Sequence, residues 1–181
     1  MIIHGLRSVF VHIPKTGGTT IRDLLQLDLS VTHDGPERCP AEVWSEFFTF
    51  CFVRNPWDKM VSSWAYHTSE NYNGVETRAV PGIKEMSFHD YVYATSHRYY
   101  WRQQTSYLKH PKTGVPIDFV GRFERFEQDV RDLCRRLGLQ REIPHMNRSE
   151  HTSYSDYYDA GLRDVVASRF SEDIALLGYH F

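Results

Sequence analysis

The sequence predicts an α/β protein in three layers, with a mostly parallel central sheet flanked by helices. Two observations predict this class. Short apolar runs rich in β-branched and aromatic residues alternate with stretches whose apolar residues recur at helical spacing. Two of these runs pass directly through a Gly- or Pro-containing turn into a helix. With 181 residues, of which 41% are hydrophobic, the chain is expected to form a single domain, residues 1–181.

The individual elements follow from local signals. Pro14 ends the first apolar run, Ser87 is a suitable N-cap, and Gly138 is well placed just beyond the end of a helix. The expected order is a strand at 8–13, a helix at 21–27, a weaker strand at 29–32, a helix at 40–47, a strand at 48–53, a helix to about residue 66, a helix at 87–93, a strand at 117–121, a helix at 124–137, a helix near 162–170 and a short helix after 171.

The composition argues against several classes of protein. The formal net charge of −2 argues against a globally basic nucleic-acid binder, so no nucleic-acid partner is expected. The three cysteines stand far apart and lack metal-ligand spacing, which favours neither a disulfide framework nor a zinc site and fits a reducing, cytoplasmic location. No stretch approaches the ~18 apolar residues of a membrane span, and the N-terminus does not look like a signal peptide. We therefore expect no membrane association.

The first segment that points to chemistry is 14–20, Pro-Lys-Thr-Gly-Gly-Thr-Thr, between a predicted strand and a predicted helix. Two glycines allow backbone N–H groups to approach an anion, and a helix N-terminus adds positive potential. Lys15 adds a full charge. The lysine precedes the glycine pair, so this is not a Walker A loop. The segment predicts a phosphate-binding loop; the alternative is an ordinary tight turn with a solvated lysine.

The second segment, 54–62, follows the strongest predicted strand, at the kind of strand end where open α/β sheets bind ligands. Arg54 is suited to hold a phosphate with its forked guanidinium. Ser62 lies one to two helical turns beyond Trp57, and Trp57 offers a stacking face for a base. In the alternative interpretation, Arg54 pairs with Asp58 and Trp57 simply packs in the core.

Together these segments resemble those of sulfotransferases that use 3′-phosphoadenosine 5′-phosphosulfate, especially the carbohydrate O-sulfotransferase branch. Residues 12–20 are similar to the 5′-phosphosulfate loop of that family, and residues 52–62 to its 3′-phosphate segment. Stretches 118–124 and 173–181 are also similar, so the resemblance spans nearly the whole chain in the expected order. It implies a P-loop-like fold in a small member of the family.

The resemblance also implies roles for individual residues. Lys15 would neutralise charge on the departing bisphosphate, as donors aimed at developing charge do. Arg54 and Ser62 would clamp the 3′-phosphate, and Arg148 would reach it from a late loop or else be solvated. Transfer would be an in-line displacement at sulfur without a metal ion. The residues expected to bind the donor are Lys15, Thr16, Gly17, Gly18, Thr19, Thr20, Arg54, Trp57, Ser62 and Arg148.

The acceptor hydroxyl needs a general base, and two neighbouring residues compete for this role. His33 is the first choice because it follows the second predicted strand, where related carbohydrate enzymes carry their base, and imidazole titrates near neutrality. Asp34 is the rival, and the whole segment is otherwise just a turn. His12, inside a predicted strand, suits a buried structural role better, and His67 is a weaker candidate.

The acceptor is expected to be a carbohydrate, with residues 71–115 as an insertion on the acceptor side; no oligomeric state is predicted. Two other functions stay open. A Mg-ATP-dependent small-molecule kinase would need a metal-binding acid at a strand end, where the chain instead has Arg54. A non-catalytic nucleotide-binding module would retain the fold alone, although Lys15 and a candidate base are both present.

Overall fold

The structure is a computed structural model that describes residues 1–27, 33–70, 72, 80–96, 98, 101–141 and 153–181. Its internal contacts divide the chain into two compact units, which we describe separately. The first comprises Met1–Arg54 and Gln104–Arg148, and the second Asn55–Gln103 and Ser149–Phe181. The chain is a mixed α/β protein, and the expectation of one cooperative domain stays a prediction.

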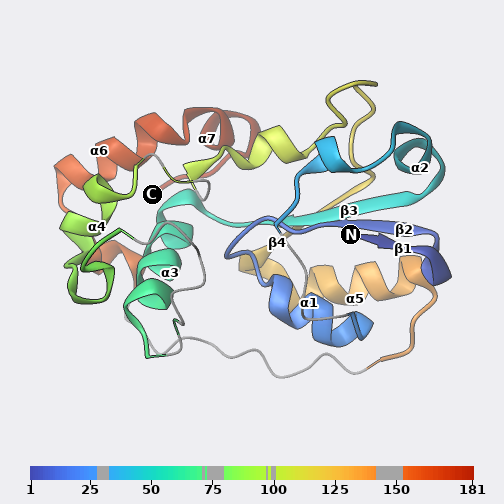
Figure 1. The fold of residues 1–181 in the computed structure, drawn as a ribbon, viewed down its shortest axis with the longest axis horizontal. Coiled ribbons are helices and arrows are strands. Elements are labelled where there is room, and N and C mark those ends of the chain that lie inside the picture. The colour runs from blue at the N-terminus through green and yellow to red at the C-terminus, as the bar shows by residue number, and fades with distance from the viewer. Residues whose placement is uncertain (28–32, 71, 73–79, 97, 99–100, 142–152) are drawn as a thin grey trace. The chain divides into compact units, whose positions relative to one another are not determined.

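A four-stranded sheet forms the centre of the first unit (Figure 1). Its strands are β1 (Ile2–Ile3), β2 (Ser8–Val11), β3 (Phe48–Val53) and β4 (Phe119–Arg122), adjacent in that order. The β2–β3 and β3–β4 pairs are parallel, and β1 pairs antiparallel with β2. The prediction of a mostly parallel sheet is confirmed. The two-residue β1 was not predicted, since it is too short to show a strand periodicity.

The predicted strands at 8–13, 48–53 and 117–121 correspond to β2, β3 and β4. The weaker strand predicted at 29–32 lies outside the described residues. In register, Phe10 of β2 lies beside Phe50 of β3, which lies beside Phe119 of β4. Parallel pairing brings the carboxyl ends of these strands to one edge of the sheet, and the two segments singled out above begin there.

Helices α1 (Gly18–Leu25) and α5 (Phe126–Leu137) cover one face of this sheet (Figure 1). Their apolar stripes form one core with the aromatic residues of the strands, through Phe10, Ile21, Leu24, Phe50, Phe52, Phe126, Val130 and Leu133. Helix α2 (Ala41–Glu46) precedes β3 and buries Trp44, whose indole N–H donates to the carbonyl of Val115. Gly138 ends α5 with a positive φ of 67°, as predicted.

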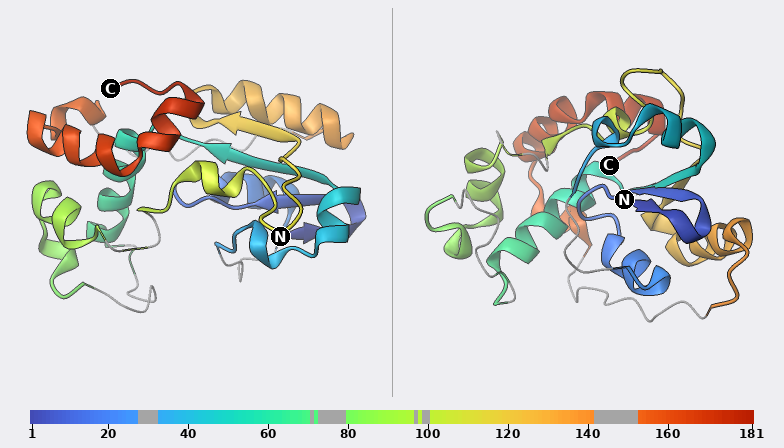
Figure 2. Two further views of the ribbon diagram at one scale, coloured as in Figure 1. Left: turned by 90° about the horizontal axis from the view of Figure 1, so that it is seen from above. Right: turned by 45° about the vertical axis from the view of Figure 1, so that its right-hand side comes forward.

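The second unit is helical in the described residues, with α3 (Pro56–Thr68), α4 (Phe88–Ala94), α6 (Ala160–Arg169) and α7 (Ser171–Leu177). Figure 2 shows these helices in two further views. The side chains of Asn55, Ser87 and Asp159 accept hydrogen bonds from first-turn N–H groups of α3, α4 and α6. The predicted helices near 87–93, 162–170 and after 171 are therefore confirmed.

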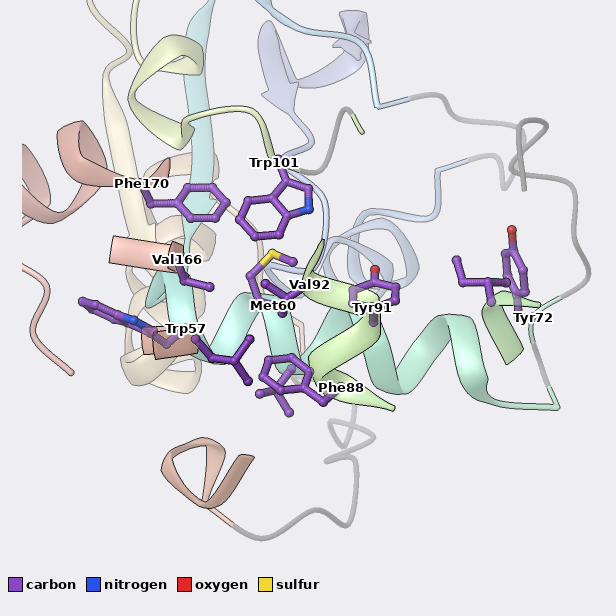
Figure 3. Close-up of a cluster of buried hydrophobic side chains, with 12 residues drawn as sticks. Trp57, Met60, Tyr72, Phe88, Tyr91, Val92, Trp101, Val166 and Phe170 are labelled. Carbon is purple, nitrogen blue, oxygen red and sulfur yellow. The ribbon is translucent and has the colours of Figure 1, made fainter. Parts of the chain in front are cut away.

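A second hydrophobic cluster holds these helices together (Figure 3). The ring of Trp101 stacks on that of Phe170, with centroids 5.6 Å apart and planes 12° apart. Met60 and Val61 of α3 are fully buried in the same cluster. Each unit therefore has its own core, which is what lets it be described by itself.

Candidate functional site

The segment between β2 and α1 forms a tight turn. Lys15 and Gly17 both have positive φ, 65° and 87°, and Gly17 is the N-cap of α1. The buried Thr16 hydroxyl donates to the carbonyl of Ile13 at 2.9 Å, which ties the loop back to the strand. That hydroxyl therefore serves the loop, whereas Thr19 is exposed and Thr20 half-buried at the helix start.

Both glycines of the loop are required by their surroundings. A Cβ built on Gly17 would lie 2.3 Å from the ring of Phe126, and one on Gly18 would lie 1.9 Å from Nε2 of His12. Larger residues would displace the helix start from the sheet. The N–H groups of Gly18, Thr19 and Thr20 form the first turn of α1, where an α-helix has no acceptors of its own, and such groups bind anions.

Arg54 directly follows β3, and both its backbone and its side chain are held in place. It is only 5% exposed. Gln104 bonds its backbone twice: Oε1 accepts from the Arg54 N–H at 2.9 Å and Nε2 donates to the Arg54 carbonyl at 2.8 Å. The guanidinium lies over the ring of Phe123 at 3.9 Å. Arg54 is therefore oriented in advance of any ligand.

The structure brings Arg54 and the phosphate-loop candidate together. Nη1 of Arg54 donates to the carbonyl of Lys15 at 3.2 Å, across 39 residues of sequence. Two cationic side chains and the first-turn N–H groups of α1 thus belong to one edge of the sheet in the first unit. An arrangement of this kind attracts a ligand with more than one negative charge.

His33 also lies at this edge, against His12. The two imidazole centroids are 4.4 Å apart with planes tilted by 43°. Burial is the main reason why the pKa of His12 falls to about 3, with smaller contributions from His33, Arg22 and Lys15. His12 is therefore neutral at physiological pH, which suits the structural role expected of it rather than that of a base.

The other candidate bases have different environments. The Asp34 carboxylate pairs with Nε of Arg38 at 3.2 Å, one helical turn further on, and both side chains are partly exposed. His67 is buried in the second unit, where its Nδ1 is 2.8 Å from the hydroxyl of Tyr91 and its ring touches Tyr72. His67 is thus a core histidine with a hydrogen-bond partner.

Of the other predicted donor-binding residues, Trp57 and Ser62 belong to the second unit. Trp57 is 4% exposed, and its indole N–H donates to the carbonyl of Arg163 within the cluster of the second unit. The indole is therefore buried, as the packing interpretation expects, and base stacking by Trp57 stays a prediction. Ser62 is half-buried on α3 in the second unit. Arg148 lies outside the described residues.

Sequence reasoning missed the residues that support Arg54. Gln104 lies fifty positions from Arg54, next to Gln103, and nothing in its local sequence marks it as a partner of Arg54. Both amides are used internally, since Gln103 donates to the carbonyl of Arg169 and accepts from the N–H of Asp173. Nothing in the sequence distinguishes Phe123 from other apolar residues, although its ring lies under the Arg54 guanidinium. No local pattern reveals such partners, because they follow from the pairing of distant segments.

Comparison with known proteins gives the class of this chain. A sequence model described as "Sulfotransferase family" matches residues 4–180, and the chain belongs to that family. It is also similar to an uncharacterized protein of Archaeoglobus fulgidus, with 30% identity over 108 residues, which cover 59% of this chain and 80% of that one. No solved structure shows a significant match.

Two further observations concern metals and membranes. In the described part of the chain, no three or more His, Cys, Asp or Glu side chains are grouped in a way that could hold a metal ion. Nor does any helix there combine the length and the apolar character that crossing a bilayer requires.

Proposed function

We propose that this protein transfers the sulfuryl group of 3′-phosphoadenosine 5′-phosphosulfate to an acceptor hydroxyl, on a carbohydrate. Membership of the sulfotransferase family supports the reaction class. The observation that carries the donor assignment is the hydrogen bond from Arg54 to the Lys15 carbonyl, which joins the two predicted phosphate-binding segments in one place. A donor with phosphates on both sides of a nucleoside needs two anion-binding groups.

The loop residues bind and orient the donor in this proposal. The N–H groups of Gly18, Thr19 and Thr20 hold the 5′-phosphate at the start of α1. The ammonium of Lys15 neutralises the charge that develops on the bridging oxygen as the sulfur–oxygen bond breaks. Because Gln104 and Phe123 orient Arg54 before binding, less conformational freedom is lost when its guanidinium meets a phosphate.

His33 is the proposed base, with Asp34 less suited because Arg38 already pairs with it. The acceptor oxygen forms a bond to sulfur while sulfur loses its bond to the 5′-phosphate oxygen. The acceptor proton passes to the imidazole of His33, and the electron pair leaves with adenosine 3′,5′-bisphosphate. Such a proton transfer typically contributes about 10²–10⁴-fold to the rate.

The donor assignment is tested by calorimetric titration of the full chain with adenosine 3′,5′-bisphosphate in EDTA, and in parallel with ATP and Mg²⁺. We expect tight metal-free binding of the bisphosphate and weak binding of ATP. A preference for Mg-ATP would contradict the proposal and favour a kinase. Binding of neither nucleotide would also contradict it.

Variants then locate the site. Arg54→Ala should weaken bisphosphate binding by about 1.5–3 kcal/mol, the range for hydrogen bonds to charged groups. Arg136→Ala is the matched control, because Arg136 also lies over a phenylalanine ring, that of Phe119, but on the exposed surface of α5. Equal effects of the two substitutions would refute the role of Arg54. Ser62→Ala tests the sequence-based prediction that Ser62 also binds the 3′-phosphate.

The carbohydrate acceptor is tested separately. Donor labelled in its sulfuryl group is incubated with the protein and a panel of mono- and oligosaccharides, and label is followed into the sugar fraction. Matched panels of phenols and primary alcohols serve as comparison. Transfer to phenols in preference to sugars would contradict the carbohydrate assignment and leave the donor assignment intact.

A further inference from the structure

His12 is conspicuous because the proposed chemistry does not use it, yet it lies between the core and the candidate base. It is a polar residue at the end of an apolar strand and is only 6% exposed. Its Nδ1 is buried and finds no hydrogen-bond partner among the residues that the structure describes. Leaving a buried polar atom without a partner costs about 1–3 kcal/mol, so such an atom needs an explanation.

The ring of His12 continues a series of stacked rings that starts in the sheet. Phe50 and Phe10 are paired across β3 and β2, with centroids 5.1 Å apart and planes 13° apart. Phe10 stacks on His12 at 5.4 Å and 20°. The His12 ring in turn lies against that of His33, with the two ring centroids 4.4 Å apart. The rigid core of the sheet is thereby connected through His12 to the residue proposed as the base.

His12 also touches the phosphate loop. Its Nε2 faces the Cα of Gly18 so closely that a Cβ there would lie 1.9 Å away. One ring thus bounds both the start of α1 and the side of His33. The compact five-membered ring fits where Gly18 approaches, and its neutral state keeps a further positive charge away from Lys15 and Arg22.

From this geometry we infer that His12 is a positioning residue, whose ring holds the imidazole of His33 in the orientation that proton transfer requires. The inference rests on the proposed role of His33 as the base. His12 touches neither the acceptor nor the departing phosphate in this account and transfers no proton. Its contribution is to restrict the rotation of the His33 ring, because small misplacements of reacting groups cost rate.

The test needs no identified acceptor, because water can replace it. The rate of release of labelled sulfate from labelled 3′-phosphoadenosine 5′-phosphosulfate, at saturating donor, is measured for wild type, His12→Ala, His33→Ala and the double variant. We expect His12→Ala to lower this rate by about 10- to 100-fold, as misplacement of a reacting group does. Affinity for adenosine 3′,5′-bisphosphate, measured by calorimetry, should stay within about threefold, given the same placement of the loop.

The double variant decides whether His12 acts through His33. If it does, removing His12 from a protein that already lacks His33 changes the rate no further, since coupled residues are not additive. If His12→Ala lowers the rate by the same factor in both backgrounds, the inference is wrong while His33 can still be the base. If His33→Ala retains the wild-type rate, the proposed base and the inference are both overturned.

Two more variants control for folding. Val11→Ala creates a cavity at the neighbouring, equally buried position of β2 and should leave the rate unchanged apart from any loss of folded protein. Where His12→Ala does not fold, His12→Asn replaces it in the cycle, because its side chain is shorter than imidazole, does not crowd Gly18 and still removes the ring against His33. The same loss of rate is expected. A folded His12→Asn protein with the wild-type rate would count against the role of the ring.

Discussion

At the scale of single residues, the phosphate loop depends on small size at two positions. Gly18→Ala would force a Cβ against the buried ring of His12. We expect a loss of about 1–3 kcal/mol in the free energy of unfolding, as for other overpacked sites. Bisphosphate affinity should fall as well, because the start of α1 must move. Chemical denaturation and calorimetry measure the two effects.

Gly5→Ala is the matched control for this prediction, because a Cβ on Gly5 meets no atom within 4 Å and its φ is not positive. Its stability should change by no more than about 0.5 kcal/mol. A Gly18→Ala protein as stable as Gly5→Ala would show that the contact between His12 and the loop is looser than the structure indicates.

Lys15 carries a second prediction at this scale. Lys15→Met removes the ammonium but keeps the length of the side chain. If Lys15 neutralises the leaving group, turnover should fall by an amount equivalent to about 2.7–4 kcal/mol in the barrier. Bisphosphate affinity should fall much less. The rate of labelled sulfate release and calorimetry provide the comparison, and an affinity loss that accounts for the whole rate effect would refute the role.

At the scale of elements, α3 and α7 each contribute a buried ionisable residue to the second unit, Lys59 and Asp173. Lys59 of α3 is 1% exposed, and its Nζ lies over the ring of Phe170 at 4.8 Å. Burial lowers the pKa of Lys59 to about 8, and the attraction of the fully buried Asp173 offsets part of that effect. The folded protein thus releases this proton at a lower pH than the unfolded chain, where the pKa is about 10.4.

The sign of the pH effect follows. Between about pH 8 and about 10.4 the unfolded state binds more protons at this residue, so stability rises with pH in that window. The rise approaches about 3 kcal/mol, at about 1.4 kcal/mol per pKa unit. Lys59→Met should lack it, and comparing denaturation of the two proteins across this range cancels the titration of other groups. Parallel pH profiles would show that folding does not lower the pKa of Lys59.

At the scale of the whole molecule, the chain passes between the two units three times, near residues 54, 103 and 148. Neither unit is one continuous segment, so we expect them to unfold in one cooperative transition, as a single domain does. Trp44 belongs to the first unit, and Trp57, Trp64 and Trp101 belong to the second. In the Trp44→Phe protein the remaining tryptophans report on the second unit, and its thermal unfolding followed by fluorescence should coincide with that of the same protein followed by circular dichroism.

Bisphosphate adds a check on the same experiment. At a ligand concentration of about 100 times Kd it should stabilise the folded state by about 2.7 kcal/mol and shift the whole transition. Two separate transitions, of which the ligand moves only one, would contradict the expectation of a single domain. The family match over residues 4–180, which covers parts of both units, is consistent with that expectation.

The sequence alone predicted the order of β2 to β4 and of the helices α1 to α7, and it proposed the segments after β2 and β3 as candidate sites. These features depend on neighbours within a few positions: apolar periodicity, Ser87 and Gly138 at helix ends, and the glycine pair after β2. Lys15 is a candidate because it stands beside the glycine pair that follows a predicted strand, and Arg54 because it follows the strongest predicted strand. Such local rules hold wherever the rest of the chain lies.

Only the tertiary structure decided what these residues touch. It placed the Arg54 guanidinium against the Lys15 carbonyl, and it joined the Arg54 backbone to the Gln104 side chain by hydrogen bonds. It also set His12 against His33, and it buried Trp57 in the cluster of the second unit, with its indole N–H on the Arg163 carbonyl. Each of these contacts joins segments about 20 to 100 residues apart. Distant segments meet through the pairing of strands and the burial of apolar faces, and no pattern within a single segment records which partners that will bring together.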